Sequence, residues 1–188
     1  MKPVFKVLLM AIAYLATFVI GSLTGLIHPM CYAYVGALLP LLFAFIYLYT
    51  STVMRSFGVA TVLNGILMIL LLIAGEADWA LVVGFVILSA LSEIIRGRQG
   101  YDSIKGIRLS FLPFAYSFFA YTAHWWTDTQ GSLAAAVEEM PAGYDQLMIP
   151  VIENIPVLII VLIITLPVAI LAIRLAERTM KKQIESFK

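Results

Sequence analysis

The chain contains two histidines, His28 and His124, and aromatic side chains lie close to both of them in sequence. An imidazole can donate or accept a hydrogen bond or ligate a metal ion, and an aromatic face can stack on a flat molecule. We therefore expect these two parts of the chain to contribute to a ligand pocket. The candidate substrate-binding residues are His28, Tyr32, Tyr121, His124 and Trp125, followed by Tyr34, Trp126 and Tyr144.

Other interpretations of these residues stay open. Trp and Tyr prefer the headgroup depth of a bilayer, so the rings could instead form an interfacial aromatic belt. Two histidines without a fixed spacing do not define a metal site. No metal site is therefore predicted, and His28 and His124 are kept as candidate ligands of haem or another metal centre.

Catalytic and nucleotide-binding motifs are missing from the sequence. It has no His-Glu-x-x-His pair, no credible Ser–His–Asp set and no G-x-x-x-x-G-K-[ST] phosphate-binding loop. We therefore expect a protein that is not an enzyme and has no cofactor of its own. Cys31 is the only cysteine, so an internal disulfide cannot form.

The elements that position these side chains are predicted to be membrane helices. Of 188 residues, 62% are hydrophobic and 12% charged, so the chain lacks the polar residues that a soluble domain needs. Six continuous apolar runs have about the length of a helix that crosses a ~30 Å hydrocarbon core. These runs are approximately residues 4–26, 30–50, 57–73, 79–95, 107–126 and 155–175. We predict an all-α integral membrane protein, a single six-transmembrane-helix bundle over residues 1–188.

The basic residues predict the orientation of this bundle. With six spans, every Lys and Arg falls on one side of the membrane, which the positive-inside rule makes cytoplasmic. Both termini are then inside, in a bacterial cytoplasmic membrane. The outer side has acidic residues and both histidines, so a cationic, neutral or metal-chelated ligand suits it better than a polyanion. The basic residues are Lys2, Lys6, Arg55, Arg96, Arg98, Lys105, Arg108, Arg174, Arg178, Lys181, Lys182 and Lys188.

Two connecting segments are long enough to have roles of their own. The basic, glycine-containing inner segment 96–106 either only fixes the topology or docks a partner through Arg96, Arg98, Tyr101 and Lys105. The outer loop 127–153 is expected to form a short helix over residues 132–140 that ends at Pro141. Such a loop is either a lid over the pocket or a passive connection.

Three smaller features concern helix packing. Ala13, Thr17, Gly21 and Gly25 recur every fourth residue, and so share one face of the first helix. Such small residues allow close helix approach, either within the chain or to a separate membrane protein. Asn64 lies in an apolar run and needs a polar partner. Glu93 and Arg96 are expected to form a structural pair at the inner interface.

The sequence also carries a family resemblance. The residues that resemble the family are 91–96 (LSEIIR), 100–106 (GYDSIKG), 177–182 (ERTMKK) and the dipeptide 28–29 (HP). With six predicted helices and small residues on the first, the chain resembles the S component of energy-coupling factor (ECF) transporters. More narrowly, it is similar to the family labelled Trep_Strep or MptD-like.

The resemblance implies a function and partners. An S component binds one small molecule at the outer face and docks onto a transmembrane T component that carries two ATPase subunits, where ATP binds. The small residues of helix one would then face the T component. The substrate is expected to be a vitamin-like or metal-chelate compound, with haem or a siderophore as one case. The alternatives are a small membrane scaffold or exporter subunit without a ligand pocket, and an intramembrane enzyme.

Overall fold

The computed structural model describes residues 2–186, and the described residues form helices without any strand. The all-helical prediction is therefore confirmed for this part of the chain. The helices are α1 (Pro3–Leu23), η1 (Thr24–Leu26), α2 (Pro29–Tyr34), η2 (Val35–Ala37), α3 (Pro40–Val53), α4 (Val59–Ala74), α5 (Trp79–Gln99), α6 (Ile104–Phe114), α7 (Ser117–Thr122), α8 (His124–Thr127), α9 (Thr129–Glu139), α10 (Tyr144–Glu153), α11 (Ile155–Thr179) and α12 (Lys181–Ser186).

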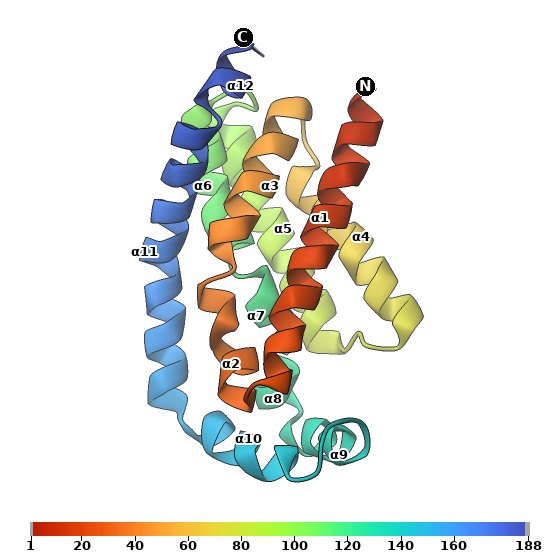
Figure 1. Cartoon of the computed structure of the whole chain (residues 1–188). Coiled ribbons are helices and arrows are strands. Elements are labelled where there is room, and N and C mark those ends of the chain that lie inside the picture. Colours follow the sequence, from red (N-terminus) through yellow and green to blue (C-terminus); the bar gives the residue numbers. More distant parts are fainter. Residues whose placement is uncertain (1, 187–188) are drawn as a thin grey trace.

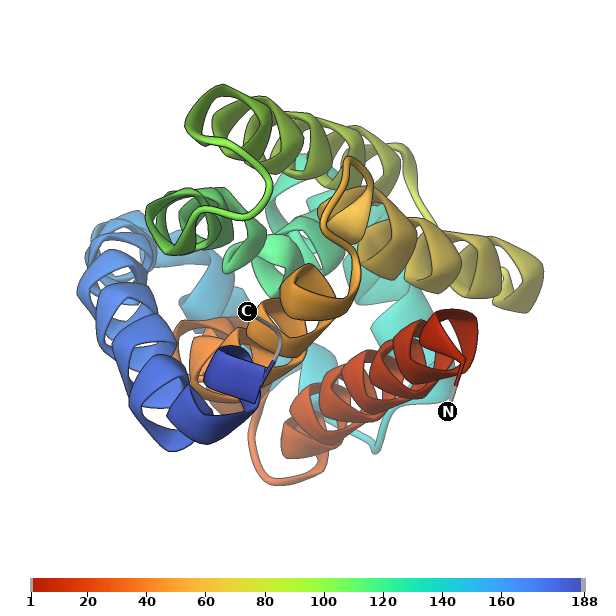
Figure 2. The ribbon, with the colours of Figure 1, turned by 90° about the horizontal axis from the view of Figure 1, so that it is seen from above.

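The long helices run along one bundle, with the two ends of the chain at the same end of it (Figure 1). The short helices α8, α9 and α10 lie at the opposite end. Viewed along the bundle, α3 occupies the middle, with α1, α4, α5, α6 and α11 around it (Figure 2). This position explains why α3 buries residues on every side, including Phe43, Tyr47 and Leu48.

Within residues 2–186, three helical segments are long and apolar enough to cross a membrane: Pro3–Leu26, Trp79–Gln99 and Ile155–Thr179. A fourth crossing is counted if Pro29–Ala37 and Pro40–Val53, which meet at a bend of 42°, act as one span. The helix Val59–Ala74 is apolar but has 16 residues, which reach about 24 Å. The prediction of several membrane helices is therefore confirmed, whereas the count of six is not.

Proline accounts for the interruption of two predicted spans. Pro40 begins α3 and Pro113 lies inside α6, whose regular helix ends one residue later at Phe114. Proline has no N–H to donate and its ring clashes with the preceding turn, so the helix bends or stops. The predicted span 107–126 is consequently divided among α6, α7 and α8.

The interior combines aromatic packing with one buried polar chain. The ring of Tyr14 packs against Phe43 and Phe114, with centroids 5.0 and 5.2 Å away. The Tyr14 hydroxyl donates to Asn64 Oδ1 at 2.7 Å, and Asn64 Nδ2 donates to Ser89 Oγ at 3.0 Å. The expectation that Asn64 finds a polar partner is thus confirmed. The two hydrogen bonds join α1, α4 and α5.

The small-residue face of α1 packs within the chain, which is one of the two alternatives left open by the sequence. Thr17, Gly21 and Gly25 are buried, and Ala13 is half-buried. A Cβ atom at Gly21 would lie 2.7 Å from Phe118 Cε2 and 2.9 Å from Leu39 Cδ1. The small residues therefore admit the chain's own large side chains, Phe118 and Leu39. The partner-helix groove stays a prediction.

Glu93 and Arg96 serve different helix ends, which corrects their assignment as a simple ion pair. The Glu93 carboxylate accepts hydrogen bonds from the N–H groups of Gly58 and Ala60 at 3.0 and 2.8 Å, at the start of α4. Arg96 Nη2 donates to the carbonyls of Ser51 and Met54 at 2.9 and 2.7 Å, at the end of α3. Each charge thus satisfies backbone groups that a helix end leaves unpaired.

Candidate functional site

A cavity of about 410 Å³ lies at the end of the bundle opposite the termini. Its wall is formed by α2, the loop between α4 and α5, α7, α8 and α9. The volume is within the range of about 300–1,000 Å³ that is typical of small-molecule pockets. The cavity therefore brings together three separate parts of the chain: α2, the loop between α4 and α5, and the consecutive helices α7, α8 and α9.

One wall of the cavity is aromatic. The ring of Tyr32 lies 6.3 Å from the rings of both Tyr121 and Trp125, nearly at right angles to each. Trp125 is 3% exposed, and its Nε1–H has no hydrogen-bond partner in the described part of the chain. A buried indole N–H usually finds a partner, so this donor is a place where a bound molecule could accept a hydrogen bond.

The other walls carry carboxylates. Asp78 Oδ1 accepts a hydrogen bond from the Leu81 N–H at 2.6 Å and so caps α5, whereas its Oδ2 is buried without a partner among the described residues. Asp128 caps α9 in the same way through the Gly131 N–H at 3.2 Å. A helix N-terminus favours a nearby negative charge, so each carboxylate complements the start of the helix that it caps. The acidic side chains that line the cavity are Glu76, Asp78, Asp128 and Glu139.

Only one of the two histidines contributes to the cavity. His124 lines it, and its Nδ1 lies 2.8 Å from Ser132 Oγ on α9. His28 is exposed and caps α2, because its Nδ1 accepts a hydrogen bond from the Met30 N–H at 3.1 Å. The structure therefore does not place His28 in the pocket, and among residues 2–186 no three His, Cys, Asp or Glu side chains form a metal-binding group.

The remaining predicted binders hold α10 in place or lie behind the cavity wall. The Tyr34 hydroxyl donates to the Val151 carbonyl at 3.1 Å, and Trp126 Nε1 donates to the Ile152 carbonyl at 3.2 Å. These two bonds fix α10 across the end of the bundle. Tyr144 packs behind Trp125, with ring centroids 6.5 Å apart, and burial raises the pKa of its hydroxyl to about 12. The hydroxyl therefore stays protonated at neutral pH.

Sequence reasoning located Tyr32, Tyr121, His124 and Trp125 correctly as neighbours but did not include the acidic residues among the binding residues. The available signal was charge segregation, because all acidic cavity residues lie on the side predicted to lack Lys and Arg.

The outer segment 127–153 contains more helical structure than expected. It forms α9 and α10 in place of one short helix, separated at Gly143, where φ is +84°.

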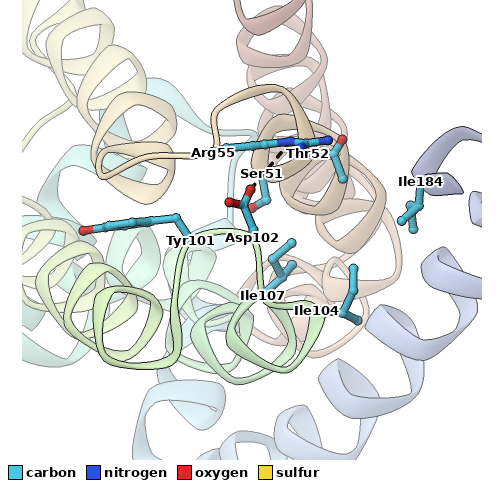
Figure 3. A pocket seen from close by; sticks show the side chains of 8 residues that line it. All are labelled: Ser51, Thr52, Arg55, Tyr101, Asp102, Ile104, Ile107 and Ile184. Atoms are coloured by element: carbon cyan, nitrogen blue, oxygen red, sulfur yellow. Dashed lines mark ion pairs between the residues drawn. The ribbon is translucent and has the colours of Figure 1, made fainter. Parts of the chain in front are cut away.

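A second, smaller cavity lies at the end that carries the termini (Figure 3). Its volume is about 100 Å³, enough for roughly three water molecules. Arg55 Nε and Asp102 Oδ1 face each other across 3.6 Å, while Ile104, Ile107 and Ile184 form its apolar side. This volume is too small for a vitamin-sized molecule, so the larger cavity is the better candidate site.

The predicted docking residues of this end are only partly accessible. Arg98 and Lys105 are exposed and Tyr101 is half-buried. Arg96 is completely buried, because it binds the carbonyl groups at the end of α3. Arg96 is therefore corrected from a docking residue to a structural one.

Comparison with known proteins identifies a family but no characterised relative. Residues 2–186 match a family described as hypothetical bacterial integral membrane protein (Trep_Strep). Neither the curated proteins nor the solved structures contain a significant match.

Proposed function

The chain belongs to the Trep_Strep family of bacterial integral membrane proteins, and we propose that it is the substrate-binding S component of an ECF-type importer. In this role it captures a small molecule at the outer face of the cytoplasmic membrane. A separate T component and two ATPase subunits complete the importer and supply the energy of ATP hydrolysis. The observation that carries the proposal is the cavity of about 410 Å³ between Tyr32, Trp125 and the acidic loop ends.

The distribution of charge supports the direction of transport. The two ends of the described chain lie at the end of the bundle where the loops after α3 and α5 also lie (Figure 1). The basic residues of the sequence fall in these segments or in the helix ends next to them. The positive-inside rule would place this end in the cytoplasm and the cavity outside, with six crossings formed by α1, α2–α3, α4, α5, α6–α8 and α11. Exposed Arg98 and Lys105 are then available for docking onto the T component or the ATPases.

The competing function is that of a membrane scaffold or exporter subunit without a ligand site. Such a protein has no need for a lined cavity in which buried polar atoms lack partners. Trp125 Nε1 and Asp78 Oδ2 are two such atoms in the described chain. Since an unpaired buried polar group costs about 1–3 kcal/mol, a ligand that satisfies these atoms is the simpler explanation.

The substrate within this proposal is a vitamin-like or metal-chelate compound. Haem is the weaker case, because His124 lines the cavity and His28 does not. Spectroscopy of the purified protein with haem tests it. A Soret shift that His124→Ala abolishes and His28→Ala leaves unchanged would support haem at this cavity, whereas the absence of any shift would exclude haem.

The proposal as a whole is tested by co-expressing the chain with the T component and ATPase subunits of its host. We expect a stable complex, ATP-dependent uptake and a copurifying small molecule that mass spectrometry detects. Ala135 lines the cavity and its neighbour Ala134 does not, although both are exposed. Ala135→Trp should therefore remove the small molecule and uptake while the complex still forms, and Ala134→Trp should remove neither. Failure of the wild-type chain to join the ATPase complex would contradict the ECF assignment.

A further inference from the structure

The charge of the cavity narrows the substrate class. Glu76, Asp78, Asp128 and Glu139 line it, and no Lys or Arg of the described chain does. Asp78 is half-buried, whereas Glu76, Asp128 and Glu139 are exposed at the cavity. Asp78 therefore interacts most strongly with a charged ligand, because the effective dielectric constant falls with burial. An anionic ligand would be repelled by these carboxylates and would find no Arg or Lys to neutralise it. The electrostatics therefore favour a cation.

Unpaired polar atoms show where such a ligand would bind. Asp78 has one carboxylate oxygen committed to capping α5 and the other buried without a partner among residues 2–186. Trp125 is more than nine-tenths buried, and its Nε1–H likewise lacks a described partner. Both residues line the cavity. Rotation of their side chains toward it would let a ligand with a positively charged donor and a separate acceptor bind both atoms.

The aromatic wall indicates the shape of the ligand. The ring of Tyr32 packs edge to face against both Tyr121 and Trp125. Such rings attract a cation placed over a face and also stack on a flat molecule. A metal ion fits this lining less well, because among the described residues no three potential ligand side chains converge.

From these observations we propose that the cavity binds an organic cation with a flat ring, recognised by Asp78 and its neighbouring carboxylates and by the Tyr32–Trp125 wall. This inference rests on the proposed function and adds the chemical class of its substrate. The same cationic chemistry could be supplied by a dissolved molecule or by the amine headgroup of a lipid, and we assign the site to the dissolved molecule.

The test uses the full-length protein in phosphatidylglycerol nanodiscs and isothermal titration calorimetry at neutral pH. The probes are 1-methylquinolinium, which is a flat cation, neutral quinoline, and the anion quinoline-2-carboxylate. We expect saturable binding of the cation, with the neutral and anionic probes at least about tenfold weaker. Equal binding of quinoline, or the absence of saturable binding of the cation, would overturn the inference.

Matched variants locate the binding. Asp78→Asn retains a residue that caps helices well, so it removes the charge and leaves the start of α5 intact. Asp78→Asn should weaken 1-methylquinolinium binding by about tenfold, and Glu139→Gln, which changes an exposed carboxylate, by about twofold to fivefold. Both variants should leave quinoline binding unchanged. Glu138→Gln is the control, because Glu138 precedes Glu139 on α9, is exposed and does not line the cavity. Equal effects of Glu138→Gln and Glu139→Gln would contradict the assignment.

Two further titrations separate the alternatives. Addition of phosphatidylethanolamine to the nanodiscs should not compete with 1-methylquinolinium, and competition would assign the site to a lipid headgroup. Zinc chloride should not compete either, and competition that depends on Asp78 would favour a metal ion over an organic cation. The proposed function is tested separately by assembly with the ATPases. A complex that imports a neutral compound would retain the importer proposal and overturn the cation inference. A chain that binds 1-methylquinolinium but does not assemble with the ATPases would retain the cation inference and overturn the importer proposal.

Discussion

Asp78 shows how a single residue can serve both the fold and the site. One carboxylate oxygen caps α5 through the Leu81 N–H at 2.6 Å, and the other lies buried at the cavity. The cap organises the first turn of a helix whose other end carries Glu93 and Arg96. The site and the long helix behind it are therefore linked through one side chain.

Substitutions at Asp78 should separate its two roles. Asp78→Ala removes the cap and is expected to lower the free energy of unfolding by about 1 kcal/mol, whereas Asp78→Asn should leave stability almost unchanged. Denaturant unfolding in detergent measures both values. An equal loss of stability in the two variants would show that the charge, and not the cap, stabilises this end of α5.

The polar chain in the middle of the bundle provides a second test at a single residue. Asn64 accepts a hydrogen bond from Tyr14 and donates one to Ser89. Loss of the Asn64 amide therefore leaves the Tyr14 hydroxyl without this partner in an apolar interior. A double-mutant cycle of Asn64→Leu with Tyr14→Phe should give a coupling of about 0.6–2 kcal/mol in unfolding experiments. The matched control is Tyr47→Phe, because Tyr47 bonds to Ser110 instead. Coupling of Asn64→Leu to the control of the same size would contradict the pairing.

At the scale of elements, interruptions of the helices build the site. Breaks near Pro40 and Pro113 divide one apolar run into α2, η2 and α3 and another into α6, α7 and α8. The shorter helices α2, α7 and α8 then deliver Tyr32, Tyr121 and Trp125 to the cavity. A straight helix through either region would direct the residues beyond the proline differently.

The inward face of α1 makes a prediction about helix packing. Gly21→Leu should lower the free energy of unfolding by about 1–3 kcal/mol or more, because a Cβ atom there already meets Phe118 and Leu39. Ala16→Leu on the exposed face of the same helix should have little effect. Thermal unfolding of both variants in detergent provides the comparison. A stable Gly21→Leu protein that no longer assembles with a T component would support the partner-groove interpretation.

At the scale of the whole molecule, the two ends differ in charge and in architecture. The end with the termini carries exposed basic residues such as Arg98 and Lys105, and its cavities, of about 100 and 280 Å³, are both smaller than the one at the other end. The opposite end carries α8, α9 and α10 and the larger acidic cavity (Figure 1). An importer subunit requires such a difference, since one end receives the substrate and the other meets the energy-coupling partners.

Thiol labelling tests the orientation of the whole molecule. In a Cys31→Ser background, Val137→Cys on α9 should react with a membrane-impermeant reagent added to intact cells, because Val137 is 63% exposed at the cavity end. Gln99→Cys, also exposed but at the other end of α5, should react only after the cells are opened. Labelling of Gln99→Cys from outside would invert the bundle and place the cavity in the cytoplasm.

The sequence by itself determined the features that depend on composition along the chain. These are the apolar helices, the separation of basic from acidic segments, and the proximity of Tyr121, His124 and Trp125. They can be predicted because helix formation in an apolar solvent and the bias of basic loops are local properties. The same reasoning could not count the crossings, since a bend at Pro40 or Pro113 depends on what packs against it.

Only the tertiary structure decided which residues meet. It joined the loop that carries Glu76 and Asp78 to Asp128 and Glu139 of the outer segment, and it left His28 outside the cavity. In the structure the small residues of α1 also face inward. Glu93 binds backbone N–H groups at the start of α4, and Arg96 binds carbonyl groups at the end of α3. These outcomes depend on contacts between segments that are distant in sequence. Which contacts form is determined by how side-chain volumes fit together and by which groups pair with unpaired backbone atoms across the bundle. A local sequence pattern contains neither kind of information.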